Sequence, residues 1–442
     1  MRRTSSGGGA PHLRRRTGLG AGCAAAVLAA TLTSCGSSAG SGPPELTWYV
    51  NPDNGGQATI AQQCTEESGG AWSLEVSVLP SSASAQREQL MRRLAGNDSS
   101  IDLMSLDPVF VPETAEAGFL LPLPAELQDT FTDGIVEGAV QGASWKDELV
   151  TAPFWANTQL LWYRTSMVEA AGLDLSQPVT WQQVIDAAAS QGSVLAEQGA
   201  RAESMTVWVN AMVESAGGSV IENPEASADE LRLGLDSDAG RAAADVMRQM
   251  TEKGVLGPGI DNRDEAATAN LFQQDGAMFM LNWPFVYAQA AAAAEGGTMD
   301  RAVFEDYGWA QFPRMSADQE SAPPLGGIDI GIGAFTEHPD QALEAVRCIV
   351  AADKQAAYMI SDGNPAAAVA AYDDPAVREA FPMADAIRES LQNAAPRPQT
   401  AYYNEVSSGI QDTFQPVSGV SERTPEEAQE FITAVLRGER LL

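Results

Sequence analysis

Histidine is nearly absent from this chain of 442 residues, which has two, and basic residues are few, with 26 Lys and Arg against 59 Asp and Glu. His338 is the only histidine after residue 12, and it stands beside Pro339 at a predicted helix start. A Ser-His-Asp triad or a histidine-based metal site is therefore not expected. The acidic groups at 236–238 and 261–265 lack the alternation and glycine of a calcium loop and predict helix caps instead. The formal charge of −33 makes nucleic acid a poor partner, because phosphate binding needs clustered Lys and Arg.

Long apolar runs are also missing after the first 34 residues, so no later segment is expected to cross a membrane. At the N-terminus, five arginines precede an apolar segment over 19–32, which ends in Leu32-Thr-Ser-Cys35. This pattern is typical of a secretion signal. The cysteine after small residues resembles a bacterial lipobox, which predicts a signal peptide over 1–34 and an acylated Cys35. The alternative is an ordinary cleaved signal with an incidental cysteine.

The predicted signal determines where the rest of the chain is expected. We expect it at the outer face of the cytoplasmic membrane, in the cell envelope, held to the membrane only by the acyl chains on Cys35. The Gly- and Ser-rich segment over 35–44 is expected to be a flexible linker. The remaining chain, about 400 residues, is larger than one hydrophobic core usually supports, which predicts two lobes.

Cysteine is scarce as well, with four in the chain, of which Cys23 lies in the predicted signal and Cys35 at its end. Cys64 and Cys348 remain, and both lie on helical patterns. An exported compartment permits a disulfide between them, which requires the chain to return late to its first lobe. The alternative is two separate buried thiols. Two thiols so far apart in sequence do not predict a zinc ribbon.

Periodic patterns predict the first elements of the chain. They are strands over 45–50, 74–79 and 101–106 and a helix over 84–94. Strands that alternate with helices predict an α/β fold with a parallel, helix-covered sheet. Asp53 and Asp107 each follow a predicted strand end, on what is expected to be one rim of the first lobe, where ligands tend to bind. Each is equally suited to be a turn former or a helix cap.

The stretch over 276–287 places a large aromatic at a predicted strand end. Residues 277–281 are apolar and predict a buried strand, which runs into a loop that carries Trp283. A helical pattern over 264–274 precedes it, so helix, strand and loop follow directly. Trp283 is then either a ring that contacts a ligand or a plug in the hydrophobic core.

The most specific pattern is a series of four segments separated by short spacers. They are Val150-Thr-Ala-Pro-Phe-Trp-Ala-Asn157, Leu160-Leu-Trp-Tyr-Arg164, Met167-Val-Glu-Ala-Ala-Gly-Leu173 and Pro178-Val-Thr-Trp-Gln-Gln-Val184. This series resembles the extracellular solute-binding proteins of ABC transporters, the family that includes the maltose-binding protein. In that family the pattern P-[FY]-x-x-N-x-x-x-L-[WY]-Y-[RN] carries the chain from the first lobe into the second. The segments over 264–283 and 325–333 continue the resemblance.

The resemblance implies an α/β, two-lobe periplasmic-binding-protein fold of type II, with three crossovers and a ligand cleft between the lobes. The implied lobes are 45–153 with 327–362, and 157–324 with 366–442. A late return to the first lobe places Cys348 near Cys64. Three crossings make a hinge, which allows the cleft to close on a ligand.

Within the family, the pattern is closest to that of actinobacterial trehalose-binding lipoproteins, which implies a set of sugar-binding residues. The set is Asp53, Asp107, Trp155, Asn157, Glu265, Trp283, Gly327, Arg397 and Tyr402. Aromatic rings suit the C–H faces of sugars, and charged and amide groups suit vicinal hydroxyls. Glycine lets backbone amides come close to a ligand.

Other roles are open for several of these positions. Asn51 and Asn54 compete with Asp53 for the same role within one turn. Glu265 is equally suited to be a first-turn acid favoured by the helix dipole. The tryptophans of the first crossover are equally suited to the core, and Trp162 is expected there.

The resemblance implies a binding protein of an ABC importer, which takes up a small carbohydrate by hinge closure and passes it to permease subunits with a cytoplasmic ATPase. Trehalose is the first expected ligand, and maltose, maltodextrin or a similar sugar is the alternative. We expect a monomer without cofactor or metal. The rival class is a glycoside hydrolase, because a pair of carboxylates about 5–10 Å apart is all that its chemistry needs. We do not expect an enzyme.

Overall fold

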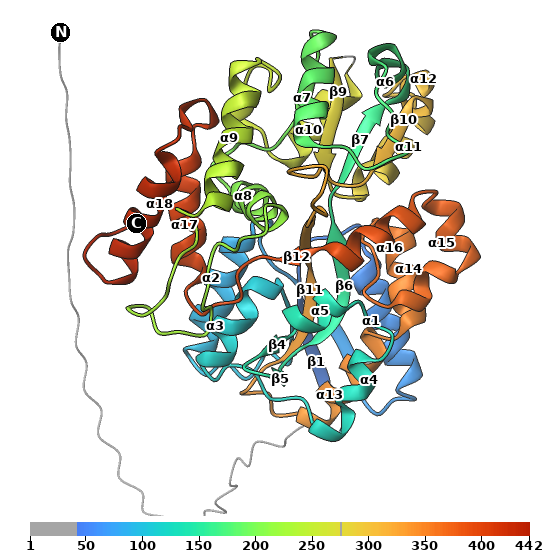
Figure 1. The fold of residues 1–442 in the computed structure, drawn as a ribbon. Helices are drawn as coiled ribbons and strands as arrows, with labels where there is room; N and C mark the ends of the chain where they lie inside the picture. The colour runs from blue at the N-terminus through green and yellow to red at the C-terminus, as the bar shows by residue number, and fades with distance from the viewer. Residues whose placement is uncertain (1–41, 275) are drawn as a thin grey trace, which may run out of the picture. The chain divides into compact units, whose positions relative to one another are not determined.

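A six-stranded and a four-stranded mixed sheet form the frame of the protein in a computed structural model, which describes residues 42–274 and 276–442 (Figure 1). The predicted signal peptide, Cys35 and most of the predicted linker lie outside the described residues. Within the described part of the chain, no helix is long and apolar enough to span a bilayer.

The first sheet has the order β12-β11-β3-β1-β2, with β6 also paired to β11. Its strands are β1 (Glu45–Val50), β2 (Ser73–Val78), β3 (Leu103–Leu106), β6 (Ala152–Thr158), β11 (Pro324–Ile332) and β12 (Ala395–Pro396). β1 runs parallel to β2 and β3, as the sequence predicts, whereas β11 runs antiparallel to β3 and β6. The sheet is therefore mixed, because the late strand enters it in the opposite direction.

Alternation along β1 sends its side chains into two cores on opposite faces of the sheet. Trp48 belongs to the core on the face that α1 (Gly56–Glu67) and α13 (Pro339–Ile349) cover. Tyr49 belongs to the core on the other face, with Leu90 of α2 (Ala83–Leu94). Helices thus cover the sheet on both faces.

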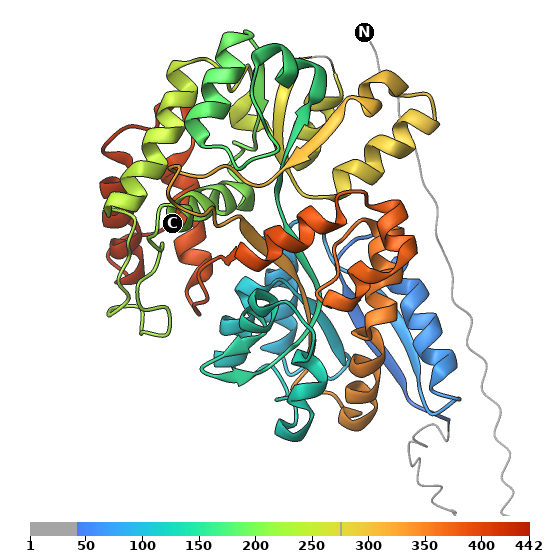
Figure 2. The same ribbon diagram turned by 45° about the vertical axis from the view of Figure 1, so that its right-hand side comes forward.

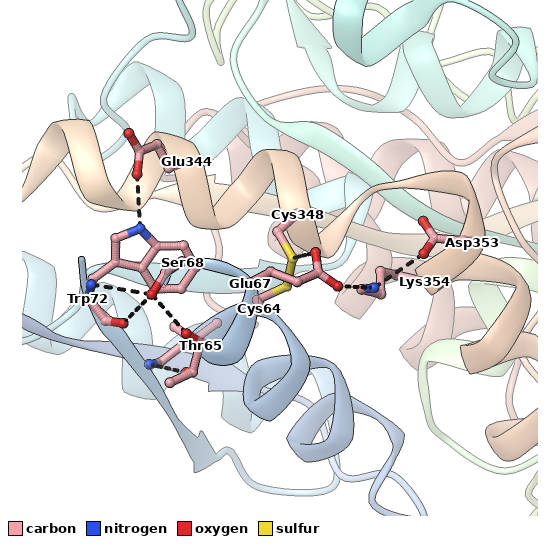
Figure 3. Close-up of a disulfide and its surroundings, with 10 residues drawn as sticks. Cys64, Thr65, Glu67, Ser68, Trp72, Glu344, Cys348, Asp353 and Lys354 are labelled. Carbon is pink, nitrogen blue, oxygen red and sulfur yellow. Dashed lines mark hydrogen bonds and ion pairs between the residues drawn. A yellow bond between two sulfur atoms is a disulfide. The ribbon is translucent and has the colours of Figure 1, made fainter. Parts of the chain in front are cut away.

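A disulfide between Cys64 of α1 and Cys348 of α13 joins two helices that are 284 residues apart, so the structure has a bonded pair and not two separate thiols. Figure 3 shows two polar contacts beside it. The Trp72 indole donates to the Glu344 carboxylate at 3.0 Å. Lys354, in α14 (Ala352–Asp362), pairs with Glu67 of α1 at 2.7 Å. The late helices are therefore held to the first helix at two points, and to the loop that follows it through Trp72.

The second sheet has the order β10-β7-β9-β8. Its strands are β7 (Leu160–Arg164), β8 (Val194–Ala196), β9 (Ala277–Asn282) and β10 (Tyr307–Ala310). One face packs Phe279 against Trp181 and Trp208, which lie on α7 (Trp181–Ser190) and α8 (Glu203–Ser215). Trp162 is fully buried on the other face, which confirms its expected place in the core.

The chain passes between the sheets at three places. β6 ends at Thr158 in the first sheet and β7 begins at Leu160 in the second, and β11 returns to the first sheet after β10. After α14 and α16 (Ala384–Asn393), the chain reaches α17 (Tyr403–Phe414) and α18 (Thr424–Leu436), which lie beside α8 and α9 (Asp238–Glu252) in both ribbon views (Figures 1 and 2). One hydrophobic core runs on from the first sheet to the second, so it does not mark where one lobe ends and the other begins. The predicted lobe boundaries therefore stay a prediction.

Candidate functional site

A cavity of about 610 Å³ lies between the two sheets and is lined from both. Seven of the nine residues implied by the resemblance line it, and they come from strand ends, crossover strands and helix starts. They are Asp107, Trp155, Asn157, Glu265, Trp283, Gly327 and Arg397. Polar residues outside the implied set also line it: Asn51, Ser81, Ser82, Ser84, Gln86, Arg201, Glu203, Ser204 and Gln411.

Trp283 and Glu265 are held together by one buried amide. Asn282 is the last residue of β9, and its Nδ2 donates to the backbone oxygen of Glu265 at 3.0 Å. Its Oδ1 accepts from the backbone nitrogen of Trp283 at 2.9 Å. The loop that carries the indole is thus tied to the first turn of α10 (Glu265–Gln273). Glu265 is therefore a first-turn acid and a cavity residue at once.

The indole of Trp283 is partly exposed and packs against the crossover strands. A Cβ on Gly326 would lie 3.3 Å from its Cη2, so the ring depends on the small residue at that position. Gly326 pairs with Asn157 across β11 and β6, and Asn157 is 7% exposed. The indole and the Asn157 amide therefore border the same part of the cavity.

Gly327 lets the two crossover strands approach each other. Its φ is +143°, and a Cβ there would lie 2.2 Å from the backbone oxygen of Trp155. No other residue adopts this conformation at that distance without a shift of the strands. Trp155 itself is half-buried, and its indole Nε1 has no hydrogen-bond partner among the described residues.

Arg397 joins the two sides of the cavity. It follows β12 and is 4% exposed. Its Nη2 donates to Asp107 Oδ1 at 2.7 Å, and its Nη1 donates to Glu203 Oε1 at 2.7 Å. Asp107 lies directly after β3 of the first sheet, and Glu203 begins α8, which packs on the second sheet. The Tyr403 hydroxyl donates to Glu203 Oε1, and Ser407 Oγ donates to Glu203 Oε2 at 2.8 Å.

Acidic groups dominate the wall around Glu265. Burial raises the pKa of Glu265, and the charges of Asp264 and Glu203 raise it further. Behind it, Glu197 is 1% exposed, and burial raises its pKa to about 8 although Arg263 opposes the shift. The guanidinium of Arg263 also donates to backbone oxygens, at 2.8 and 3.0 Å. The wall is therefore poor in free positive charge.

Two residues of the implied set lie elsewhere. Asp53 accepts from the backbone nitrogens of Gly55 and Gln57, at 2.9 and 2.7 Å, and so caps the start of α1. It borders a neighbouring cavity of about 690 Å³. Asn51, which competes with it in the same turn, lines the site cavity instead. Tyr402 packs against the hydrophobic core between the second sheet and α8, and it does not line the cavity.

The other acidic groups have structural partners. Ser237 caps α9, Asp264 caps α10, and Asp261 accepts from the backbone nitrogen of Val417. Among the described residues, no group of three or more His, Cys, Asp or Glu side chains is placed to hold a metal ion.

A larger cavity of about 730 Å³ lies beside the disulfide, lined by Cys348 and by small and acidic residues. None of the residues implied by the resemblance to bind sugar lines it. The cavity between the sheets, which gathers most of them, is therefore the candidate site.

Comparison with known proteins places the chain in a family. The family model described as bacterial extracellular solute-binding protein matches residues 73–364. A probable ABC transporter-binding protein of Deinococcus radiodurans is 22% identical over 348 residues, which cover 75% of this chain and 78% of that protein.

Solved structures agree with the fold. The maltose-bound MalE3 of T. maritima superposes with a TM-score of 0.74 at 24% identity, over 90% of this chain and all of that one. A solute-binding protein of Thermotoga lettingae bound to α-D-tagatose has a TM-score of 0.71 at 21% identity, over 89% of this chain and 99% of that one. The predicted α/β two-lobe fold is thereby confirmed. The chain belongs to the bacterial extracellular solute-binding proteins, whose members bind solutes for ABC transporters and are not enzymes.

Proposed function

We propose that the protein is the substrate-binding lipoprotein of an ABC importer and that it captures a small carbohydrate, with the disaccharide trehalose as the first candidate. The observation that carries the proposal is the cavity between the sheets, where Trp283 and hydrogen-bonding groups from both sides surround one space. An indole face suits the C–H surface of a sugar ring, and carboxylates and amides suit its hydroxyls. Trp155 adds an indole N–H that has no partner in the described part of the chain.

Hinge closure is the proposed mechanism. We assign 45–153 with 327–362 to one lobe and 157–324 with 366–442 to the other. A sugar that contacts Asp107 on one side and Glu265 with Trp283 on the other favours the closed form, because it gains contacts there that the open form lacks. The closed monomer is then the form that the permease subunits receive, and the cytoplasmic ATPase drives transport.

Acylation of Cys35 is the proposed means of attachment to the outer face of the cytoplasmic membrane. In cells, the wild-type protein should fractionate with membranes, and a Cys35→Ala variant should be released in soluble form. Mass spectrometry of the mature N-terminus should show the diacylated cysteine. An unmodified residue at the mature N-terminus would contradict this part of the proposal.

Isothermal titration calorimetry of the mature protein tests the ligand class. The panel contains trehalose, maltose and sucrose, with a short peptide as the comparison. We expect saturable binding of at least one disaccharide and none of the peptide. Maltose is the second candidate, because a relative of similar fold is described with bound maltose. Failure of every sugar to bind would overturn the proposal.

A further inference from the structure

Four of the five charged groups that line the cavity form ion pairs. The five are Asp107, Arg201, Glu203, Glu265 and Arg397. Arg397 is bonded to both Asp107 and Glu203, and Arg201 forms an ion pair with Asp412. Each arginine of the lining thus already faces at least one carboxylate, so neither adds an uncompensated positive charge to the cavity.

Glu265 is the exception. Among the residues that the structure describes, its carboxylate has no ion-pair partner and no hydrogen bond to another side chain; it is hydrogen-bonded only to its own backbone, and the residue is half-buried at the cavity wall. The charges nearest to it are the acids Asp264 and Glu203. A half-buried carboxylate without a side-chain partner favours a ligand that supplies hydrogen-bond donors, because leaving the charge unpaired as the cavity loses water is costly.

The cation closest to it in sequence does not pair with it. Arg263 lies two residues before Glu265, and its Nη2 donates to the backbone oxygens of Leu256 and Pro258. The carboxylate that acts on Arg263 is Glu197, which is itself buried. The hydrogen bonds of Arg263 thus go to the backbone and not to Glu265, and its charge is offset only as Glu197 ionises near pH 8.

We propose that Glu265 acts as a charge filter, so that the cavity accepts uncharged sugars and rejects sugars that carry a carboxylate or phosphate. A hydroxyl donates its hydrogen to the Glu265 carboxylate, whereas an ionised acid group has no hydrogen to donate and is repelled by it. Arg397 cannot reverse this preference, since its two carboxylates already neutralise it. This inference rests on the proposed function and specifies its substrate class.

The test compares each neutral disaccharide with an analogue of the same shape. Trehalose and maltose are titrated beside the forms in which both primary hydroxymethyl groups are oxidised to carboxylates. Oxidation at both ends places a carboxylate on each ring, so exchange of the two rings in the cavity does not remove the anion. Titrations are made at pH 8, because burial raises the pKa of Glu265 and the filter requires the ionised form. We expect the neutral form to bind at least tenfold more tightly.

Two variants separate the filter from a general effect of the analogue. Glu265→Gln keeps the shape of the side chain and removes its charge, so the ratio of the two affinities should fall at least fivefold. Glu305→Gln removes a charge from an exposed helix position outside the cavity and should leave the ratio unchanged. Thermal melting and circular dichroism check that both variants are folded.

The outcomes distinguish the two proposals. Equal affinity of neutral and dicarboxylate forms in the wild type overturns the charge filter alone, as does an unchanged ratio in Glu265→Gln. Absence of binding by every neutral sugar overturns the proposed function and the filter with it.

Discussion

Arg397 and Asp107 form an ion pair of 2.7 Å although 290 positions separate them in the chain. Asp107 follows β3 of the first sheet, and the other hydrogen-bonding arm of Arg397 holds Glu203 at the start of α8. The bridge from Asp107 through Arg397 to Glu203 therefore crosses the cavity that the proposed ligand occupies. Its geometry depends on how far the two sides of the cavity are apart.

Replacement of Asp107 by Asn should weaken sugar binding about tenfold, or about 1.4 kcal/mol. Arg397 is 4% exposed and would lose one of its two carboxylates, so the contact across the cavity becomes weaker. Calorimetry measures the change. Asp412→Asn is the matched control, because it also removes the partner of an arginine, but Arg201 is 55% exposed and such pairs contribute less than about 1 kcal/mol. Equal effects of the two variants would contradict the role of Asp107.

Removal of the Trp283 indole should cost roughly 2 kcal/mol of binding free energy or more, since buried aromatic anchors dominate such sites. The protein should stay folded, because the ring is partly exposed and lies on a loop. Calorimetry of Trp283→Ala with the best-bound sugar gives the loss. Trp309→Ala removes an indole of β10 that does not line the cavity and should leave the affinity unchanged. Unaltered affinity in Trp283→Ala would refute the site.

The disulfide should contribute to stability without affecting the site. The bond joins residues 284 positions apart, and native disulfides typically contribute about 2–4 kcal/mol. We expect a lower melting temperature for the double variant Cys64→Ala, Cys348→Ala, measured by differential scanning calorimetry. Neither cysteine lines the cavity, so sugar affinity should be retained. A reductant should lower the melting temperature of the wild type but not of the variant; a response of both would contradict the assignment.

Stability should fall as the pH rises from 5 to 8. Burial raises the pKa of Glu197 to about 8, and the unfolded value is about 4.3. Between these values the folded chain holds a proton that the unfolded chain has lost, so the free energy of unfolding decreases as pH increases. Glu197→Gln should flatten the dependence of the melting temperature on pH in this range and raise the stability at pH 8. Parallel pH profiles of the two proteins would show that Glu197 does not cause the slope.

Periodicity was sufficient to predict much of the frame. The alternation in 45–50 and 74–79 predicts β1 and β2 within one residue, because strands with alternate faces in two cores must show it. The helix, strand and loop that end at Trp283 are local in sequence and were predicted in order. The antiparallel entry of β11 was not predicted from periodicity, since direction within a sheet depends on how the chain returns to it.

Side-chain roles were harder to predict where several polar residues share one turn. Asp53 and Asn51 lie two residues apart, and only the backbone conformation directs the first to the amides of α1 and the second to the cavity. Glu203 has the same sequence signal as any acid in a first helical turn. Its place in the cavity follows from contacts with Arg397 and Tyr403, which are about 200 residues away and which no local pattern contains.

The amide of Asn282 fixes the spacing of Glu265 and Trp283, since both are hydrogen-bonded to it. Under the proposed hinge closure, motion of one lobe against the other leaves that spacing unchanged, so these two groups form a platform that is present before and after closure. A sugar that settles on the platform already has its ring face and one row of hydroxyls engaged. Closure then adds contacts with the opposite wall, which carries Asp107. The association rate of the sugar and its final affinity are thereby separable quantities.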